Sequence, residues 1–508
     1  MISTPQLVAS ACLVLVLLWL RRRSLTHKLP PGPKPLPILG NALQMPTQRG
    51  WLTYAEWAKN HGDIVYVHIF GQPLVLLNTL EMANDLLVKR SLIYSDRARM
   101  VMAGELAGYA EEMVFSNYGD RLRDMRKLFH RELNSPGLDK YWPLHTDASR
   151  NFVRNLWDGS NQIEEHVINF GGSLILEAVY GYHAAPKNDE WIKLSQDVMK
   201  SFTSASEPGA WLVDFIPALR YIPKWFPGAG FRIVAEVWRD EHLRFVHDPY
   251  FWSKANQDRV TKPNFATTVF DEHAGNPPAK VEECLRWTLT SIWGGGADTT
   301  VSTIMSFFLA MGMFPDVQRR GQEEIDRVIG SNRLPEISDR EDLPFIEAIS
   351  REALRWNPVV PMAPPHKLTQ DDEYLGYELP AGSLVLVNIW SILHDEKLFP
   401  DPFDFKPDRF IDNPVASKAV SAAFGFGRRI CPGVQFAETS IFIAIATALA
   451  TSNISNAVDE TGNPMSAVDL KYSSGNISHP PPFRCGVKPR SITAACLLAA
   501  SVADASEC

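Results

Sequence analysis

A single cysteine in a glycine-rich loop is the side chain of this sequence best suited to bind a metal. Residues 424–433 read FGFGRRICPG, and Cys431 carries the only sulfur among them. The three glycines allow the backbone to turn tightly and to approach a flat partner, while Pro432 removes an amide donor and stiffens the loop. The two arginines can stabilise a thiolate or bind carboxylates. A buried structural cysteine is the alternative, because cysteine is often buried, but these neighbours favour a thiolate ligand.

Two more groups of polar residues lie in segments with the apolar spacing of helices. Glu352 and Arg355 are three residues apart within 343–356, so they can form an ion pair on one helix face. Residues 294–300 read GGGADTT inside the longer helix expected at 280–313. Each glycine costs about 1 kcal/mol relative to alanine inside a helix, so a plain core helix should not contain three of them. The segment therefore serves a purpose that needs space, and a merely polar interruption is the alternative.

The loop at 424–433 resembles the haem-binding loop of the cytochrome P-450 family, the haem-thiolate monooxygenases. The resemblance extends from the proline-rich segment near the N-terminus to about residue 489, and four separate motifs follow in the order typical of the family. It implies a cytochrome P-450 fold, mainly α with minor β, and one haem b (iron protoporphyrin IX). The sequence contains no Cys-x-x-Cys-His motif, which is consistent with non-covalent haem.

The same resemblance assigns roles to the residues of the loop. It implies that Cys431 is the axial iron ligand and that Arg429 binds a haem propionate. Phe424 would pack beside the sulfur, and Gly425 belongs to the same haem-binding turn. A thiolate ligand pushes electron density onto iron and favours O–O cleavage, so the expected chemistry is oxygen insertion into C–H bonds.

The other two motifs also match the family. By resemblance, Thr299 donates a hydrogen bond to dioxygen in the pocket and Asp298 supplies protons through a relay. Glu352 and Arg355 correspond to a buried pair joined by a third residue, Arg409, in a Pro-x-Arg-Phe segment. A buried ion pair rarely recovers its desolvation cost without further partners, so these three residues are expected to form the scaffold of the haem pocket.

Weaker matches concern the haem propionates. Residues 118–127 resemble a family helix in which Arg126 binds a propionate, but Leu122 replaces the tryptophan that usually stands four residues before the arginine. This change removes an indole donor. His366, after two prolines, matches a further propionate contact, although a lone histidine is often a surface or packing residue.

The N-terminus predicts a membrane anchor. Residues 7–20 are apolar except for Ser10, and the uncharged stretch extends back to Met1. About 20 such residues can span roughly 30 Å as a helix. Three arginines at 21–23 keep that flank in the cytosol, so we expect a single-pass protein of the endoplasmic reticulum membrane with a cytosolic catalytic domain. A cleaved signal peptide is the alternative, but neither its charge pattern nor its cleavage site is present.

Composition favours one large folded body. The chain has 508 residues, 45% of them hydrophobic and 21% charged, as in globular proteins. We expect a transmembrane signal anchor at 1–20, a basic and proline-rich hinge at 21–41, and the catalytic domain at 42–490. An Ala/Ser-rich tail at 491–508 would be a frayed helix or a loose end.

Periodicity predicts mostly helix with a small sheet. Residues 64–70 and 74–77 are expected to form a hairpin around a Gly-Gln-Pro turn, and 373–379 and 384–388 are further extended runs. Apolar residues recur at spacings of three and four in seven other segments. The expected helices are 84–90, 119–134, 188–203, 280–313, 316–330, 343–356 and 434–450.

The partners follow from charge and from the resemblance. The net charge of −8, with no arginine-rich tail, disfavours nucleic acid as a partner. The resemblance implies dioxygen and electrons from NADPH–cytochrome P-450 reductase, with cytochrome b5 as a further candidate donor. A basic helix could receive an acidic donor, and a solvated charged face is the alternative. Its residues are Arg121, Arg123, Arg126, Lys127 and Arg131.

The resemblance also places the substrate pocket. Its lining should be mostly apolar, which favours a lipophilic small molecule, and segments 388–390 and 478–483 resemble fungal members that tailor secondary metabolites such as terpenoids or aromatics. Glu105, Glu111 and Glu112 could bind an amine, or could simply be solvated. The expected lining segments are 97–117, 293–297, 359–363 and 475–477.

Two other functions remain open. The first is a haem-thiolate isomerase or dehydratase that rearranges a peroxide without a reductase. Asp298 and Thr299 disfavour it, because such chemistry does not need proton delivery to dioxygen. The second is a non-catalytic haem-binding membrane protein, for which Leu122 is the only indication.

Overall fold

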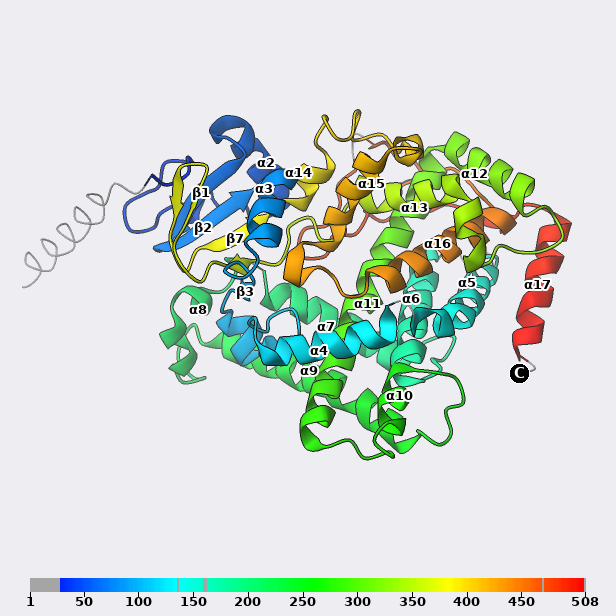
Figure 1. The fold of residues 1–508 in the computed structure, drawn as a ribbon, viewed down its shortest axis with the longest axis horizontal. Coiled ribbons are helices and arrows are strands. Elements are labelled where there is room, and N and C mark those ends of the chain that lie inside the picture. The colour runs from blue at the N-terminus through cyan, green and yellow to red at the C-terminus, as the bar shows by residue number, and fades with distance from the viewer. Residues whose placement is uncertain (1–27, 135–136, 159–161, 208, 468–469, 507–508) are drawn as a thin grey trace, which may run out of the picture.

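The computed structural model describes residues 28–134, 137–158, 162–207, 209–467 and 470–506. Within these residues helices predominate, and a small sheet lies at one end of the molecule (Figure 1). The expected anchor at 1–20 lies outside the described residues. The α-helices are α2 Gly50–His61, α3 Leu80–Ala83, α4 Asp120–Leu133, α5 Trp142–Leu156, α6 Ile163–Tyr180, α7 Glu190–Ala205, α8 Leu212–Phe215, α9 Gly230–Ala255, α10 Phe265–Asp271, α11 Ala279–Met313, α12 Pro315–Val328, α13 Pro344–Trp356, α14 Ile389–Leu393, α15 Pro414–Val420, α16 Val434–Thr451 and α17 Ile492–Ser506.

Short 3₁₀ and π turns connect many of these helices. The two π segments are η2 Asn84–Lys89 and η3 Val101–Leu106. The 3₁₀ turns are η1 Ala42–Gln44, η4 Tyr109–Glu111, η5 Gly137–Tyr141, η6 Pro217–Tyr221, η7 Ile337–Asp342, η8 Pro407–Phe410, η9 Ser421–Phe424 and η10 Gly427–Arg429. The strands are β1 Ile64–Ile69, β2 Gln72–Leu77, β3 Asp96–Arg97, β4 His366–Lys367, β5 Asp372–Tyr374, β6 Tyr377–Leu379, β7 Leu384–Val387, β8 Ser452–Ile454 and β9 Val487–Pro489.

The larger sheet has the order β1-β2-β7-β4-β3. The expected hairpin is present as antiparallel β1 and β2. Its turn consists of Phe70 and Gly71, both with positive φ, so it begins one residue before the expected Gly-Gln-Pro turn, whose Gln72 and Pro73 belong to β2. Strand β7 pairs in parallel with β2, and β4 joins β7 antiparallel. At the far edge β3 pairs with β4 so that Arg97 lies opposite His366. The sheet thus places two basic residues, distant in sequence, side by side.

Helix α11 runs through the middle of the helical body and matches the expected bounds within one residue (Figure 1). It packs closely against α6, because glycines remove side chains at the crossing. A Cβ on Gly296 would lie 2.9 Å from Ile175, and one on Gly171 of α6 would lie 2.9 Å from Val301. The space predicted from the glycine run is therefore used partly for this crossing of two helices.

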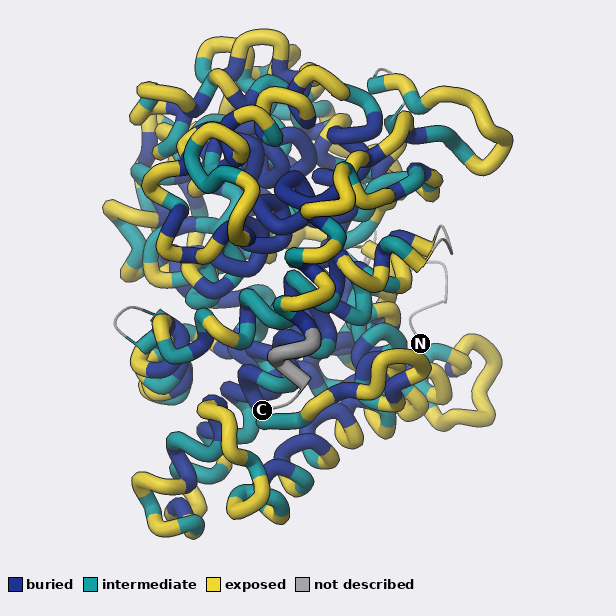
Figure 2. The backbone as a smooth tube through the Cα atoms, turned by 90° about the vertical axis from the view of Figure 1, so that its right-hand side faces the viewer, coloured by how far each residue is buried: buried dark blue, intermediate teal, exposed yellow. Residues whose placement is uncertain are grey.

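Helix α16 is apolar on all sides, and most of it is buried in the core. It is long and apolar enough to span a membrane, as are α11 and α12 together across a sharp bend, but burial identifies α16 as a core helix. Figure 2 shows the buried backbone in the interior and the exposed loops at the periphery.

Several segments differ from the expectations drawn from periodicity. The run 373–379 is a hairpin, β5 and β6, because Leu375 and Gly376 adopt positive φ between them. The helix expected at 84–90 is the π segment η2. The start of the proline-rich segment packs on the sheet, where Pro31 accepts a hydrogen bond from the Tyr66 amide at 2.9 Å. The C-terminal segment forms α17, whose Leu498 is fully buried.

Candidate active site

The cysteine loop is held in one shape by its own backbone. The Cys431 amide donates to the Phe424 carbonyl at 2.7 Å, which closes the loop just before α16. Gly425 has φ +81° and Gly427 has φ +54°, conformations that side-chain-bearing residues rarely adopt. A Cβ on Gly427 would also lie 2.0 Å from the Leu87 carbonyl of η2. The glycines therefore shape the loop and allow it to dock on the neighbouring segment.

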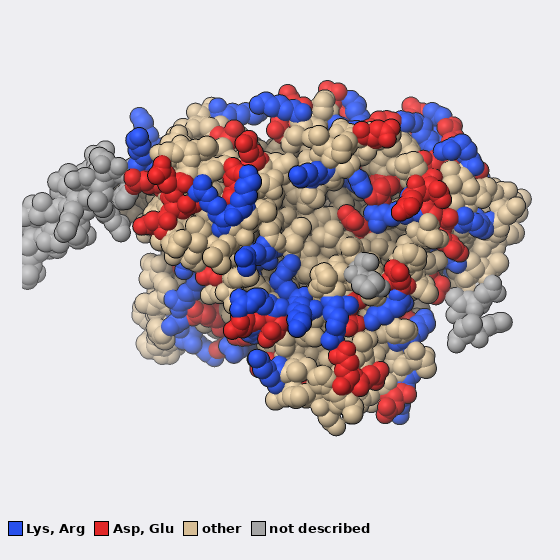
Figure 3. Space-filling model, in the orientation of Figure 1, with Lys and Arg blue, Asp and Glu red and all other residues tan. Residues whose placement is uncertain are grey.

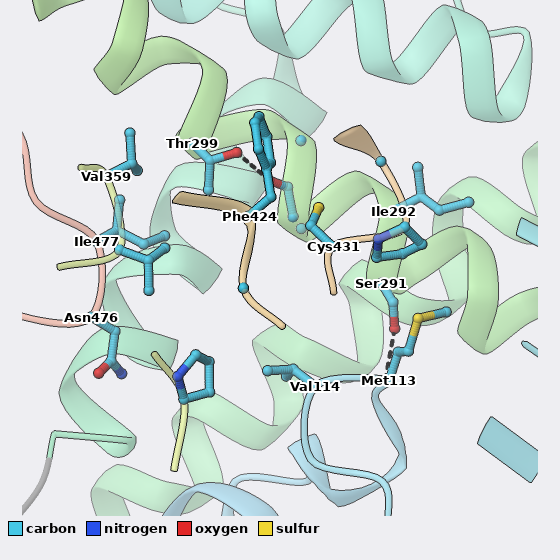
Figure 4. Close-up of a pocket in the computed structure, with 18 of the residues that line it drawn as sticks. Met113, Val114, Ser291, Ile292, Thr299, Val359, Phe424, Cys431, Asn476 and Ile477 are labelled. Atoms are coloured by element: carbon cyan, nitrogen blue, oxygen red, sulfur yellow. Dashed lines mark hydrogen bonds between the residues drawn. The ribbon is translucent and has the colours of Figure 1, made fainter. Parts of the chain in front are cut away.

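The sulfur of Cys431 opens into a cavity of about 410 Å³. Cys431 is exposed to this cavity but otherwise surrounded by protein, and burial raises the pKa of its thiol. The Gly433 amide and the positive charge of Arg126 oppose that rise by favouring the thiolate. Figure 4 shows Thr299 of α11 and Cys431 facing the same space, with Phe424 beside them. The cavity thus brings a potential thiolate ligand and a hydroxyl together.

Three arginines line one part of the same cavity. Arg97 donates to the Val114 carbonyl at 3.0 Å and to the Pro364 carbonyl at 2.6 Å. Burial, followed by the charge of Arg429, lowers the pKa of Arg97 to about 9, and burial lowers that of Arg429 to about 10. Burial also lowers the pKa of Arg126. Charges buried together in this way favour an anionic ligand between them.

Arg429 and His366 have protein partners as well. Arg429 donates to the Ser95 carbonyl at 2.7 Å and to the Ser116 carbonyl at 2.6 Å. The Nδ1 of His366 donates to the Tyr94 carbonyl at 2.7 Å. Burial, followed by the charge of Arg97, lowers the pKa of His366 well below its ordinary value. The ring is then neutral with its proton on Nδ1, so Nε2 can donate to a carboxylate only after taking up a proton.

These residues fit a haem. No described carboxylate lies within ion-pair distance of Arg97, Arg126 or Arg429, so they can receive carboxylates from a ligand. Among the described residues no three His, Cys, Asp or Glu side chains could hold a bare metal ion. One cysteine facing an apolar cavity with cations to one side suits a metal held by a flat, doubly anionic macrocycle.

Thr299 and Asp298 point in different directions from α11. Thr299 lines the cavity, and its hydroxyl donates to the Gly295 carbonyl at 2.7 Å. A Cβ on Gly295 would meet nothing within 4 Å, so this glycine leaves open space beside the hydroxyl. Asp298 does not line the cavity, because its carboxylate pairs with His479 Nε2 at 3.2 Å. Any proton that Asp298 supplies must therefore pass from outside the cavity.

The pairing with Asp298 has a pH dependence with a defined sign. Burial disfavours the imidazolium of His479, but the hydrogen bond and charge of Asp298 outweigh burial and raise its pKa above the ordinary 6.5. A raised folded-state pKa contributes stability that is complete below the unfolded pKa and is lost as pH rises through the folded pKa. The pair should therefore stabilise the protein in mildly acidic solution and cease to do so in alkaline solution.

We expect His479→Gln to reduce the free energy of unfolding more at about pH 6 than at about pH 9. The difference should be at most about 1 kcal/mol, because both side chains are partly exposed. Urea unfolding at the two pH values measures it. His183→Gln, which removes an exposed histidine beside Glu177, serves as the control. Equal losses at both pH values would show that the pair does not titrate as described.

A buried ionic network is built on α13. Arg355 makes two hydrogen bonds to Glu352, at 2.6 and 2.9 Å, and both side chains are fully buried. Arg409 of η8 donates to the same carboxylate at 3.1 Å, and so does the Lys406 amide at 2.8 Å. The remaining guanidinium donors reach backbone carbonyls, including Leu393 at 3.0 Å. The structure therefore brings the three expected residues together in a network whose buried charges are satisfied.

Known proteins are similar to this chain in sequence and in fold. The family model described as cytochrome P-450 matches residues 30–466. The chain belongs to the cytochrome P-450 family. This P-450 is 42% identical over 487 residues to cytochrome P-450 monooxygenase 105 of Postia placenta, covering 95% of this chain and 92% of the relative. It is 35% identical over 483 residues to tryptamine 4-monooxygenase of Psilocybe cyanescens, covering 92% and 94%.

A solved structure agrees on the fold. A zebra fish cytochrome P-450 determined with abiraterone superimposes with a TM-score of 0.70 at 20% identity, covering 87% of this chain and all of that one. The predicted P-450 fold, mainly helical with small sheets, is confirmed. The family binds haem b through a cysteine thiolate, and the relatives are named monooxygenases. This P-450 is thus an oxidoreductase of the haem-thiolate monooxygenase class.

The expected basic helix of this P-450 is α4. Figure 3 shows Lys and Arg side chains gathered across the middle of one face, over α4. Arg121 pairs with Glu111 at 3.0 Å, Arg123 with Asp120, and Arg131 with Glu132 at 2.9 Å. Arg126 belongs to the cavity instead, as does Leu122 at the usual tryptophan position. Part of the positive charge on this face is therefore already balanced.

The substrate side of the cavity draws on the four expected segments, though not on every residue in them. Trp293 does not line the cavity, because it stacks on Phe245 of α9 with ring centroids 3.8 Å apart. Sequence reasoning placed Arg97 only within a substrate-lining segment and missed its grouping with Arg429, and it also missed His479 as the partner of Asp298. A lone arginine in a variable segment carries no signal, and the partner of Asp298 is visible only once the chain has folded. The members facing the cavity include Val114, Gly295, Val359, Met362, Asn476 and Ile477.

Proposed function

We propose that this P-450 inserts one oxygen atom from dioxygen into a lipophilic small molecule, with Cys431 as the haem iron ligand. The observation that carries this proposal is the position of the Cys431 sulfur, which shares one largely apolar cavity with Thr299 and the buried arginines. The haem supplies the activation of dioxygen, which a thiolate ligand favours. The following roles of the chain's own residues belong to the same proposal.

The protein would bind and orient the haem through groups already in place. Arg97, Arg126 and Arg429 would receive the two propionates, which would relieve the cost of their buried charges. His366 would be a secondary contact at most, because its Nε2 carries no proton while the ring is neutral. Phe424 lines the cavity beside the sulfur and would exclude water from it.

Thr299 and Asp298 would handle protons. The Thr299 hydroxyl faces the cavity and can turn from the Gly295 carbonyl toward a ligand. Asp298, one residue earlier, could bring protons from the His479 side of α11, which is partly open to solvent. The neighbouring positions thus suit a relay from solvent through a carboxylate to a hydroxyl at the reaction site.

We expect Thr299→Ala to uncouple NADPH consumption from product formation. Removing the hydroxyl takes away the proton donor in the cavity, so the product formed per NADPH should fall about tenfold or more, as for loss of a general acid. Thr288→Ala is the matched control. Its hydroxyl makes the same bond to a carbonyl four residues earlier, Cys284, at 2.7 Å, but it does not line the cavity. Unchanged coupling in Thr299→Ala would remove Thr299 from the mechanism.

The substrate is proposed to be a lipophilic secondary metabolite such as a terpenoid or an aromatic compound. The lining beyond the sulfur is mostly apolar, with Val114, Ile292, Val359 and Ile477 facing the space in Figure 4. One relative with 35% identity is named for tryptamine, an aromatic compound, which supports the aromatic alternative.

Electrons are proposed to come from NADPH through cytochrome P-450 reductase, with cytochrome b5 as a further candidate. The basic face over α4 supports this, since Arg123, Lys127 and Arg131 are exposed and can attract an acidic partner (Figure 3). Positive charge there lies on the outer side of the helix that also contributes Arg126 to the cavity. An electron donor docked on this face would be close to the haem.

We also propose attachment to the endoplasmic reticulum membrane through residues 1–20, followed by a hinge at 21–41, the catalytic domain at 42–490 and a tail at 491–508. Exposed apolar side chains support it. Trp225 is 81% exposed, and other large apolar residues surround it between α8 and α9. Phe215 of α8 contacts Phe70 of the β1–β2 turn, at the end of the molecule where the described chain begins (Figure 1). That end would face the lipid.

A further inference from the structure

One buried acidic residue, Glu112, lines the substrate cavity. Among the described lining residues it is the only acidic one, and it is 8% exposed. Its backbone is fixed, because its carbonyl accepts from the Ser116 amide at 2.9 Å and its amide donates to the Tyr109 carbonyl at 3.0 Å. The next amide, of Met113, donates to the Ser291 hydroxyl of α11 at 3.0 Å. Glu112 is therefore held at a defined place in the wall.

Glu105 and Glu111, the other two acids of this segment, are already neutralised. Glu105 pairs with Arg99 at 2.6 Å and also with Arg220. Glu111 pairs with Arg121 at 3.0 Å. By contrast, no described lysine or arginine lies within ion-pair distance of Glu112. The three acids thus differ, and only Glu112 is buried at the cavity without a permanent cation.

The partner of Glu112 is His242 of α9. The His242 Nε2 lies 2.8 Å from Glu112 Oε1, and the ring is fully buried. Its Nδ1 has no hydrogen-bond partner among the described residues. Since a carboxylate oxygen can only accept, Nε2 donates to it. This bond engages Oε1 and orients Glu112, so that Oε2 remains for a ligand.

A cluster of aromatic rings adjoins the His242 side of this pair. The ring centroids of Tyr109 and His242 lie 4.1 Å apart. The ring centroid of Phe202 lies 5.4 Å from that of Tyr109 and 5.7 Å from that of Phe115. All three of Tyr109, Phe115 and Phe202 line the cavity. Aromatic faces attract cations, and a buried negative charge is costly until a cation or a strong donor pairs with it.

The other polar groups on this side of the cavity bind one another. The Ser291 hydroxyl is occupied by the Met113 amide, and the Asn476 amide donates to the Ser206 hydroxyl at 2.6 Å. These groups have less capacity left for a ligand than a carboxylate, which has two oxygens and about four acceptor sites. Glu112 is therefore the strongest polar anchor that the substrate side offers.

We propose that Glu112, positioned by His242, binds the protonated amine of the substrate, so that this P-450 acts on lipophilic compounds that carry a basic nitrogen. This inference rests on the monooxygenase function proposed above. The ammonium group would lie among Tyr109, Phe115 and Phe202, and the apolar remainder of the substrate would extend along the cavity toward Thr299 and the haem. The anchor would thus decide which carbon of the substrate comes within reach of the reaction.

A binding experiment tests the proposal without turnover. The haem-loaded enzyme is titrated by calorimetry with N,N-dimethyl-2-(1-naphthyl)ethylamine and with its uncharged carbon isostere, 1-(3-methylbutyl)naphthalene. We expect the wild type to bind the amine at least about tenfold more tightly, as for a hydrogen bond to a charged group. Glu112→Gln should abolish that preference while the isostere binds as before, and Glu105→Gln, which lies outside the cavity, should retain it.

Three results would overturn the proposal: no preference for the amine in the wild type, a preference that survives in Glu112→Gln, or equal weakening of both ligands. The wild-type comparison stands even if Glu112→Gln fails to fold. The proposal also fails separately from the monooxygenase function. Amine binding that depends on Glu112, without oxygen insertion, would contradict only the function, whereas oxygen insertion without an amine preference would contradict only the anchor.

Discussion

Replacing Cys431 by serine should abolish product formation and the absorption spectrum of thiolate-bound haem in the carbon monoxide complex. A serine hydroxyl does not ionise near neutral pH, so it would neither ligate the iron as an anion nor favour O–O cleavage. The loop itself should persist, because its closing bond runs from the residue 431 amide to the Phe424 carbonyl and does not involve the side chain. The loss should therefore be chemical and not a failure to fold.

Cys284→Ser is the matched control for this substitution. Cys284 lies in α11, is partly buried and does not line the cavity, and burial raises the pKa of its thiol. We expect this variant to keep both the spectrum and the activity. The carbon monoxide spectrum and the product yield of the two purified variants test whether Cys431 is the iron ligand. A thiolate-type spectrum in Cys431→Ser, or its loss in Cys284→Ser, would show that another cysteine is the ligand.

Glu352→Gln should be the most destabilising of the conservative substitutions described here. The carboxylate balances two buried guanidinium groups, those of Arg355 and Arg409, and accepts the Lys406 amide as well. A glutamine keeps the shape but removes the charge and turns an amide toward guanidinium donors. Breaking a buried pair from one side costs about 3–5 kcal/mol. Urea unfolding should show a loss of that size, together with weaker retention of haem.

The control for this prediction is on the same helix. Glu347 of α13 pairs with Arg340 at 2.8 Å and Arg351 at 2.9 Å in a less buried position. Since partly solvated pairs contribute little, Glu347→Gln should cost at most about 1 kcal/mol. If Glu352→Gln cost no more than Glu347→Gln, the buried network would not be the scaffold of the site.

The parts of the site that could be predicted from the sequence are those in which neighbouring residues act together. The cysteine loop is one continuous segment, closed by a bond between Phe424 and Cys431. Glu352 and Arg355 are a turn apart on one helix, so their pairing follows from helix geometry. The hairpin formed by β1 and β2 and the bounds of α11 also follow from local periodicity.

The remainder depends on contacts between distant segments. Arg97 reaches the cavity because β3 pairs with β4, opposite His366, and nothing local to Arg97 indicates this. The glycines of α11 predict a need for space, but Gly296 accommodates Ile175 of α6, and Gly295 is the one of the three that faces open space. The run of glycines thus has two causes, helix packing at Gly296 and open space at Gly295, which the sequence alone does not distinguish.

Two long helices show why periodicity fails. Helix α6 contains Gly171 and Gly172, which disfavour a helix in isolation but allow contact with Val301 of α11 and Ile192 of α7. Helix α9 continues through Pro249, a residue that usually ends a helix. In both helices tertiary packing outweighs local propensity, and the same packing carries His242 of α9 to Glu112.

The most direct test of the central claim, oxygen insertion at Cys431, is mass spectrometry of products formed under isotopically labelled dioxygen. The full chain is co-expressed with a cytochrome P-450 reductase in cells supplied with terpenoids and small aromatic compounds, with the Cys431→Ser chain as the comparison. The account predicts a product that carries one labelled oxygen atom and is absent with Cys431→Ser. A product that forms without label, or that still forms with Cys431→Ser, would contradict it.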